Sequence, residues 1–163
     1  MLKPAQIYKE QIQEECTKLW YSQEDIYWNG GTGSYEIDFS DSNYGRHQFA
    51  SVDSGGSVIG YISYSVDWAA KSADNFAAVS FCKSGIEFAH DLYRTVCDLF
   101  EVYHMNRVSW VAYADNPAVR GYRNFIKKHG GRECGYYRQV SVLLDGRLHD
   151  CISFEILAEE FSR

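Results

Sequence analysis

The stretch around Asn116 brings together residue types that can bind and act on a ligand. Residues 107–114 alternate in the manner of a strand, and Asn116 and Pro117 then begin an amphipathic helix that ends at Gly130-Gly131. An Asn side chain offers a hydrogen-bond donor and an acceptor at the carboxyl end of a strand, where α/β proteins commonly bind ligands. We therefore expect a cofactor-using enzyme to do its chemistry at this junction.

Tyr122 lies six residues after Asn116, between one and two turns into this helix. A phenol at this place could donate a proton to a leaving thiolate or hydrogen-bond to a bound ligand. The alternative is a core role, because Tyr122 shares the apolar face of the helix with Phe125 and Ile126. The residues by themselves leave both interpretations open.

A second strand-to-helix turn follows residues 75–82, a short apolar stretch that predicts a strand buried on both faces. The unpaired NH groups and partial positive charge of a helix N-terminus suit a pyrophosphate. Gly85 would let the backbone approach such a group closely, and Lys83 would add a mobile cation. The alternative is that Ser84 and Glu87 form a capping box that only begins the helix.

Other groups are weaker candidates for chemistry. The five histidines lack metal-ligand spacing, and no helical pattern follows Gly31-Thr32-Gly33, which favours a loop. Arg120, Arg123 and Lys127 form a cationic stripe that could meet a phosphate or simply face solvent. No cysteine is paired with a nearby histidine, and we expect no metal site.

Composition limits the kind of protein. The 163 residues fit one domain, and the formal charge of −6 disfavours a nucleic-acid partner. The chain starts without an apolar signal stretch and has no run of about 18 apolar residues. We therefore expect a soluble, cytoplasmic protein without a membrane partner. The five cysteines are widely spaced with no C-x-x-C pair, which predicts reduced, mostly buried thiols.

The remaining periodicity supplies the elements that must position these residues. In chain order we expect a helix from Pro4, strands at 48–53 and 58–68 around Ser54-Gly55-Gly56-Ser57, a strand at 75–82, a helix from Ser84, a strand at 107–114, a helix to His129, and two strands around Asp145-Gly146. This order predicts an α/β fold, a central mixed sheet flanked by helices.

Two segments resemble the C-terminal half of the GNAT acyl-CoA N-acyltransferases, most closely the ribosomal-protein acetyltransferase-like branch. They are residues 114–131, with Asn116 and Tyr122, and residues 145–150. The order of elements also matches, so the resemblance implies that residues 1–163 form a single GNAT-like N-acetyltransferase domain. The pyrophosphate loop departs from the family pattern of a basic or Gln residue followed by two spaced glycines. Only Gly85 is retained there, so this loop is degenerate.

The resemblance implies an N-acetyltransferase that transfers an acetyl group from acetyl-CoA to a primary amine by direct attack, without a metal. Tyr122 would be the general acid on the leaving thiolate. The residues implied to bind acetyl-CoA are Lys83, Ser84, Gly85 and Ile86 at the pyrophosphate, Asn116, and Val79 and Phe81 through their main-chain atoms along the pantetheine arm.

The other partner implied is an amine acceptor, either a small molecule or a protein terminus, and a homodimer is compatible with the resemblance. Asp67, Asp74 and Asp115 sit at predicted strand ends, where each could take a proton from the amine or serve as a turn residue. The alternative function is a catalytically inactive GNAT-fold binding or regulatory module. The degenerate loop and the aromatic-rich residues 20–44 favour that alternative.

Overall fold

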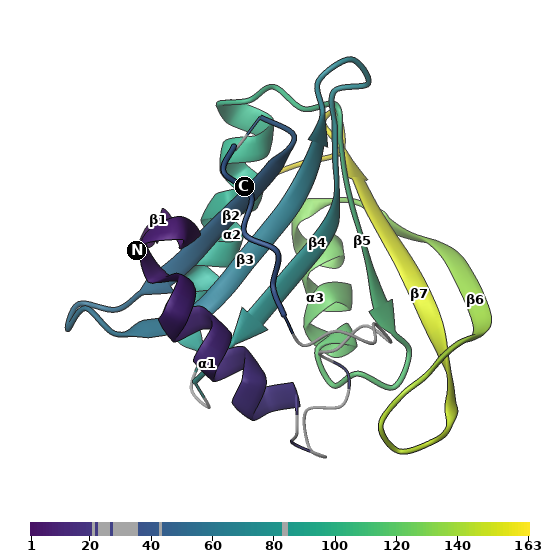
Figure 1. Cartoon of the computed structure of the whole chain (residues 1–163). Helices are drawn as coiled ribbons and strands as arrows, with labels where there is room; N and C mark the ends of the chain where they lie inside the picture. Colours follow the sequence, from purple (N-terminus) through teal and green to yellow (C-terminus); the bar gives the residue numbers. More distant parts are fainter. Residues whose placement is uncertain (21, 23–26, 28–35, 43, 83–84) are drawn as a thin grey trace.

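A seven-stranded mixed sheet organises the chain (Figure 1). The computed structural model describes residues 1–20, 22, 27, 36–42, 44–82 and 85–163. The strands are β1 (Leu2–Pro4), β2 (Arg46–Val52), β3 (Val58–Asp67), β4 (Ser72–Ser80), β5 (Arg107–Tyr113), β6 (Arg132–Val142) and β7 (Leu148–Leu157). Their order across the sheet is β1-β2-β3-β4-β5-β7-β6. The α/β class expected from the sequence is confirmed.

Helices cover both faces of the sheet. The helices α2 (Ile86–Glu101) and α3 (Val119–His129) lie on one face, and α1 (Lys9–Trp20) crosses the other (Figure 1). Leu99 of α2 and Ile62 of β3 are fully buried in the core between that helix and the sheet. Ile12 of α1 is fully buried in the core on the opposite face. Each of these two helices thus packs an apolar face on the sheet. Within the described residues, no helix is long and apolar enough to span a membrane.

The N-terminal helix begins later than expected. Pro4 ends the short strand β1, a turn of 3-10 helix covers Ala5–Tyr8, and α1 starts at Lys9. Pro4 pairs with Phe49 of β2 at the edge of the sheet. An edge strand tolerates a proline because only one side of its backbone needs a partner, so the prediction of a helix opening at Pro4 was wrong.

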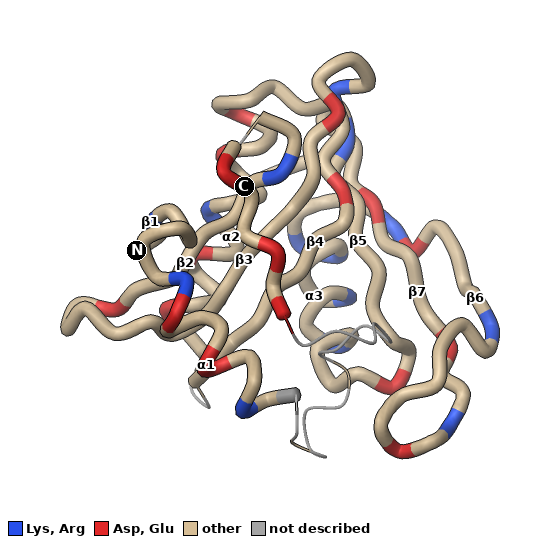
Figure 2. Tube along the Cα trace, viewed as in Figure 1, with Lys and Arg blue, Asp and Glu red and all other residues tan. Residues whose placement is uncertain are grey.

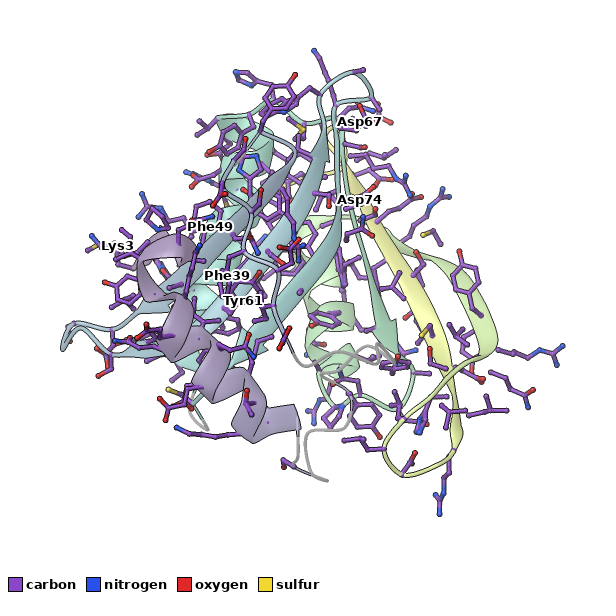
Figure 3. The ribbon with its side chains drawn as sticks, in the orientation of Figure 1. Lys3, Phe39, Phe49, Tyr61, Asp67 and Asp74 are labelled. Atoms are coloured by element: carbon purple, nitrogen blue, oxygen red, sulfur yellow. The ribbon has the colours of Figure 1, made fainter. Side chains whose placement is uncertain are left out.

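The predicted hairpin of β2 and β3 is confirmed, with Gly56 supplying a φ of 88° in its turn. Gly60 of β3 packs against α2 so closely that a Cβ there would lie 2.6 Å from the Val79 carbonyl oxygen and would collide with the Phe88 ring. This contact fixes the distance between α2 and the sheet. Figure 3 shows the opposite side, where Phe39 and Tyr61 meet beneath α1 with ring centroids 6.3 Å apart.

Strand β4 differs from its prediction. It runs from Ser72 to Ser80 instead of 75–82, and it is not buried on both faces, because Asn75 and Ala77 are exposed. Asn75 has a φ of 52°, and the β3–β4 register shifts beside it, as at a β-bulge. The local sequence does not reveal this bulge, because the bulge depends on how β4 pairs with β3.

The C-terminal half follows the sequence prediction closely. Strand β5 covers Arg107–Tyr113, α3 ends at His129, and Gly130 takes a φ of 94° as its C-cap. The strands β6 and β7 pair antiparallel around Asp145-Gly146, with Gly146 at a φ of 74°. The cysteines form no disulfide, but two of the five, Cys82 and Cys134, are exposed, so burial of the thiols is only partly as expected.

Candidate active site

The central feature of the site is a separation between two parallel strands. Strands β4 and β5 pair only at Ser72 with Arg107 and at Ala73 with Val108, and they then diverge (Figure 1). Parallel neighbours in a sheet usually share a continuous ladder of slanted hydrogen bonds. Their divergence leaves the second half of β4 without a partner on the β5 side and opens a V in the sheet.

A cavity of about 420 Å³ lies in this V and extends between the helices, within the roughly 300–1,000 Å³ typical of small-molecule sites. Strand β4 contributes Phe76, Ala78 and Ser80 to its wall, and α2, β5 and α3 supply the rest. The other lining residues are Phe88, Ala89, Leu92, Tyr93, Val96, Val108, Trp110, Val111, Ala118, Gly121, Tyr122 and Phe125. Most of these side chains are apolar, so the cavity suits a ligand with an apolar arm.

The register of β4 decides which backbone groups face the V. The Phe81 N–H donates to the Ile59 carbonyl at 2.9 Å, and Val79 is paired with Tyr61 two residues away. Backbone groups of an antiparallel strand alternate in direction, so Phe81 and Val79 direct theirs toward β3. Ala78 and Ser80 therefore present their N–H and C=O groups to the V. The backbone groups that face the V thus lie one residue away from the predicted Val79 and Phe81.

Tyr122 lies on the cavity wall, in the first turns of α3. Its ring meets Trp110 and Phe154 edge-on, with centroids 6.0 Å and 5.8 Å away. Burial raises its pKa, so the phenol keeps its proton at neutral pH. Among the described residues, no group hydrogen-bonds to its hydroxyl. The Tyr122 ring thus packs in the core while the residue also lines the cavity, and its role toward a ligand stays a prediction.

Trp110 is a cavity residue that the sequence analysis did not single out. Its side chain lines the cavity, and its indole Nε1 is buried without a hydrogen-bond partner in the described part of the chain. The alternating pattern of β5 places Trp110 on the same face of the strand as Val108 and Ala112. It could not show that the N–H would lack a partner, because that depends on residues distant in sequence.

Asn116 begins the approach to α3 by a side-chain hydrogen bond. Its Oδ1 accepts from the Ala118 N–H at 2.9 Å, and its carbonyl accepts from Val119 at 2.9 Å. The helix itself begins at Val119, two residues after Pro117. The N-cap of α3 is Ala118, which makes no side-chain cap hydrogen bond, so Asn116 stabilises the turn before the helix and the prediction that the helix begins at Asn116 and Pro117 was wrong by two residues. With Oδ1 engaged, the Nδ2 donor is the group left for a ligand.

The predicted pyrophosphate turn is only partly covered by the structure, because Lys83 and Ser84 lie outside the described residues. Gly85 occupies the N-cap position of α2, and its carbonyl accepts from the Ala89 N–H at 2.8 Å. Ile86 is the first helical residue, and its side chain is 81% exposed. A Cβ on Gly85 would lie 3.2 Å from Ser80 Oγ, so glycine keeps the end of β4 and the start of α2 in close contact.

The three aspartates that could take a proton from the amine, Asp67, Asp74 and Asp115, have different structural environments. Asp67 accepts from the Ala69 and Ala70 N–H groups at 2.9 Å, which makes it a turn residue. Figure 3 shows Asp67 and Asp74 toward the end of the sheet where β3 turns into β4, away from the open end of the V. Asp115 lies at the end of β5, one residue before Asn116, and is thus the aspartate placed at the predicted junction.

His149 links Asp115 to the final hairpin. Its ring is buried, with Nε2 3.1 Å from both carboxylate oxygens of Asp145 and Nδ1 3.4 Å from Asp115 Oδ2. The Arg147 backbone N–H and this imidazole lower the pKa of Asp145. Within the described residues, no three His, Cys, Asp or Glu side chains gather as metal ligands would.

The cationic stripe predicted on α3 faces solvent. Figure 2 shows Lys and Arg along this helix, and the side chains of Arg120, Arg123 and Lys127 are exposed. Arg123 is bound to Glu133 of β6, with Nε 2.6 Å from Oε1. The stripe therefore lies outside the cavity wall, although its neighbours Gly121 and Tyr122 belong to that wall.

Comparison with known proteins identifies the fold. No family model and no curated protein sequence matches the chain. Among solved structures, a probable acetyltransferase is similar with a TM-score of 0.68 at 18% identity, covering 91% of this chain and 87% of its own. A variant of the spermidine N-acetyltransferase SpeG from Vibrio cholerae is similar with a TM-score of 0.64 at 17% identity, covering 90% and 92%. The fold is that of GNAT acetyltransferases.

Proposed function

We propose that residues 1–163 form an acetyl-CoA-dependent N-acetyltransferase of the GNAT superfamily, in its ribosomal-protein acetyltransferase-like branch. The observation that carries the proposal is the V between β4 and β5, with Tyr122 on the wall of the cavity inside it. A sheet that opens at one parallel pair offers an unpaired strand edge and a cavity together. An acyl-CoA needs both, because its pantetheine arm combines amide groups with apolar segments.

The described residues fit such a ligand. Ala78 and Ser80 offer backbone N–H and C=O groups to the amides of the arm, in place of the Val79 and Phe81 main chain first expected. Gly85 leaves the N-terminus of α2 open to a pyrophosphate, with Ile86 following. Our proposal adds Lys83 and Ser84 to this end of the site and the Asn116 amide to the other.

Bound acetyl-CoA would supply an activated thioester, and the amine would attack it directly. Tyr122 would donate its phenolic proton to the departing sulfur, and its raised pKa keeps that proton available at neutral pH. The acceptor is a primary amine on a small molecule or protein terminus. Asp115 is the favoured aspartate for recruiting that amine, because it lies at the junction beside Asn116.

The proposal also places the enzyme in the cytoplasm. All five cysteines are free, and a set of unpaired thiols suits a reducing compartment. Cys16 illustrates a structural thiol, because burial raises its pKa to about 12 and makes the reactive thiolate scarce.

Calorimetric titration with acetyl-CoA and with desulfo-CoA tests the proposal. We expect both to bind, and we expect thiol release from acetyl-CoA to depend on an added amine. Failure of both ligands to bind at millimolar concentration would contradict the proposed function. Spermidine belongs in the amine panel, because the similar SpeG structures are of a spermidine N-acetyltransferase.

One observation favours a second function, a binding or regulatory module without catalysis. Of the glycines expected in the pyrophosphate loop, only Gly85 is retained. A module of this kind would bind a protein partner and would release no thiol from acetyl-CoA. Acyl transfer to any amine in the panel excludes it.

A further inference from the structure

The polar groups of the cavity wall are few. Among the fifteen described residues that line the cavity, side-chain N–H or O–H groups belong only to Ser80, Tyr93, Trp110 and Tyr122. Ser80 Oγ donates to the Cys82 carbonyl at 3.0 Å, and interaction with the Cys97 thiol raises the pKa of Tyr93. The Ser80 hydroxyl is therefore already engaged. Among the described side chains that line the cavity, Trp110 has a fully buried donor without a partner, and the Tyr122 phenol lies beside it.

The Trp110 N–H is buried, and no described residue accepts its hydrogen bond. An unsatisfied buried donor costs about 1–3 kcal/mol, so such groups generally have an unseen partner such as water or a ligand. Indole is a donor only, which means that the missing partner carries an acceptor atom. Since the donor belongs to a cavity-lining side chain, a ligand in the cavity is the natural source of that atom.

The indole ring is held by its neighbours. Phe154 stacks on it at 5.4 Å with planes 10° apart, and Phe125 meets it edge-on at 6.3 Å. Tyr122 meets it edge-on at 6.0 Å. Rings packed on several sides cannot turn to find another acceptor, so the direction of the N–H is set before any ligand arrives.

We infer that Trp110 is a binding residue for the acyl donor, whose carbonyl oxygen accepts the indole N–H. The inference rests on the proposed function. A neutral carbonyl is the acceptor that suits this place, because none of the described residues that line the cavity carries a cation to balance a buried anion. The carbonyl can belong to an amide of the pantetheine arm or to the thioester.

The thioester alternative gives Trp110 a part in the reaction. The amine nitrogen bonds to the carbonyl carbon while the indole N–H stabilises the negative charge on the oxygen. The carbon–sulfur bond then breaks, and the sulfur takes the Tyr122 proton. The extra proton of the amine leaves to solvent, and solvent reprotonates the Tyr122 phenolate. The amide alternative restricts Trp110 to holding the arm in place.

The proton–nitrogen spectrum of the indole groups tests the inference on the intact chain, which has four tryptophans. Trp110→Phe identifies the Trp110 resonance by its loss. Should that variant not fold, phenylalanine replacements of the other three tryptophans, Trp20, Trp28 and Trp68, identify it by elimination. The ligands are acetyl-CoA, CoA and adenosine bisphosphate, which lacks the pantetheine arm.

We expect the Trp110 indole proton to move downfield with acetyl-CoA and not with adenosine bisphosphate. An equal movement with CoA assigns the hydrogen bond to an amide of the arm, and a movement with acetyl-CoA alone assigns it to the thioester. We also expect Trp110→Phe to weaken acetyl-CoA binding about tenfold. Trp68→Phe is the matched control, because that indole already donates to the Tyr44 carbonyl and does not line the cavity.

Two results would overturn the inference in distinguishable ways. If acetyl-CoA binds by calorimetry and the Trp110 resonance stays in place, the assignment of Trp110 fails while the proposed function stands. If none of the three ligands binds, the proposed function and the inference fail together.

Discussion

The indole of Trp110 and the phenol of Tyr122 meet edge-on on one wall of the cavity, with ring centroids 6.0 Å apart. One residue comes from β5 and the other from α3, so the packing of helix on sheet brings the two donors together. Each N–H or O–H is left without a partner among the described residues. A ligand in the V would thus meet a proton donor and a hydrogen-bond donor side by side.

Replacing Tyr122 by phenylalanine separates its chemical role from its packing role. Tyr122→Phe keeps the ring contacts with Trp110 and Phe154 and removes only the hydroxyl. We expect kcat to fall about 100-fold or more, with acetyl-CoA affinity changed less than about threefold. Steady-state kinetics and calorimetric titration measure the two quantities. An unchanged kcat would remove Tyr122 from the general-acid role.

The pH dependence of the wild-type enzyme provides a second check on Tyr122. Burial raises the pKa of the phenol, so its proton is present below the ordinary value for tyrosine and is lost only above it. We expect no descending limb from this group in the pH–rate profile below about pH 10. If kcat of the wild-type enzyme falls between neutral pH and about pH 10 while that of Tyr122→Phe does not, the phenol loses its proton below the ordinary pKa of tyrosine, which would contradict this expectation.

The two sides of the β4 backbone predict opposite effects of proline. In Ala78→Pro the lost N–H faces the V, so we expect acetyl-CoA affinity to fall about tenfold with a small change in thermal stability. In Val79→Pro the lost N–H faces β3, so we expect a destabilisation of more than about 2 kcal/mol. Calorimetric titration and thermal unfolding compare the pair. Equal loss of stability in both variants would contradict the register assigned to the open edge.

Local patterns predict much of this fold because they report which residues share a face. The alternation in residues 107–114, Gly130 as the stop of α3 and the turn at Gly146 all depend on neighbours close in sequence, and all three appear in the structure. The divergence of β4 from β5 depends on pairing between residues far apart in sequence, such as Ser72 with Arg107. No periodicity within either strand encodes such a separation.

The candidate site was harder to predict than the fold for the same reason. Asn116 and Tyr122 carry local signals, and the structure places Asn116 in the turn before α3 and Tyr122 on the cavity wall. The direction of the β4 backbone groups depends on the register with β3 and on the bulge at Asn75, and neither can be read from the local sequence. Trp110 became a candidate only because its neighbours leave its N–H without an acceptor.

The contact of Gly60 with α2 predicts a severe effect of a single methyl group. In Gly60→Ala the new Cβ would lie 2.6 Å from the Val79 carbonyl oxygen and against the Phe88 ring, which lines the cavity. We expect a loss of about 2–3 kcal/mol in the free energy of unfolding, and weaker acetyl-CoA binding. Gly45→Ala is the control, because nothing lies within 4 Å of a Cβ there. Equal stability of the two variants in urea unfolding would show that α2 moves freely away from the sheet.

Glu155 of β7 forms ion pairs with Arg107 of β5 and Arg132 of β6, and its ionisation should make the stability of the fold depend on pH. Its side chain is buried, and its carboxylate accepts from Arg132 Nε at 2.8 Å and from Arg107 Nε at 3.0 Å. The hydrogen bond from Arg132, with that from Arg107, holds the pKa of Glu155 below its ordinary value. A carboxylate with a depressed pKa stabilises the fold fully above its unfolded pKa, and the contribution is lost as pH falls through the folded pKa.

We therefore expect the free energy of unfolding to decline as pH falls below about 4.5, and we expect Glu155→Gln to flatten that part of the curve. At neutral pH, we expect Glu155→Gln to lower the free energy of unfolding by about 1–3 kcal/mol, because the charged hydrogen bonds to both arginines are lost. The loss stays in this range because both arginine side chains are partly exposed and water can solvate them. Glu14→Gln removes the exposed pair with Lys18 and should change stability by less than about 0.5 kcal/mol. Urea unfolding at several acidic pH values measures the free energy of unfolding of the wild-type protein and both variants. If the free energy of Glu155→Gln declines with falling pH as steeply as that of the wild type, the pH dependence belongs to other carboxylates.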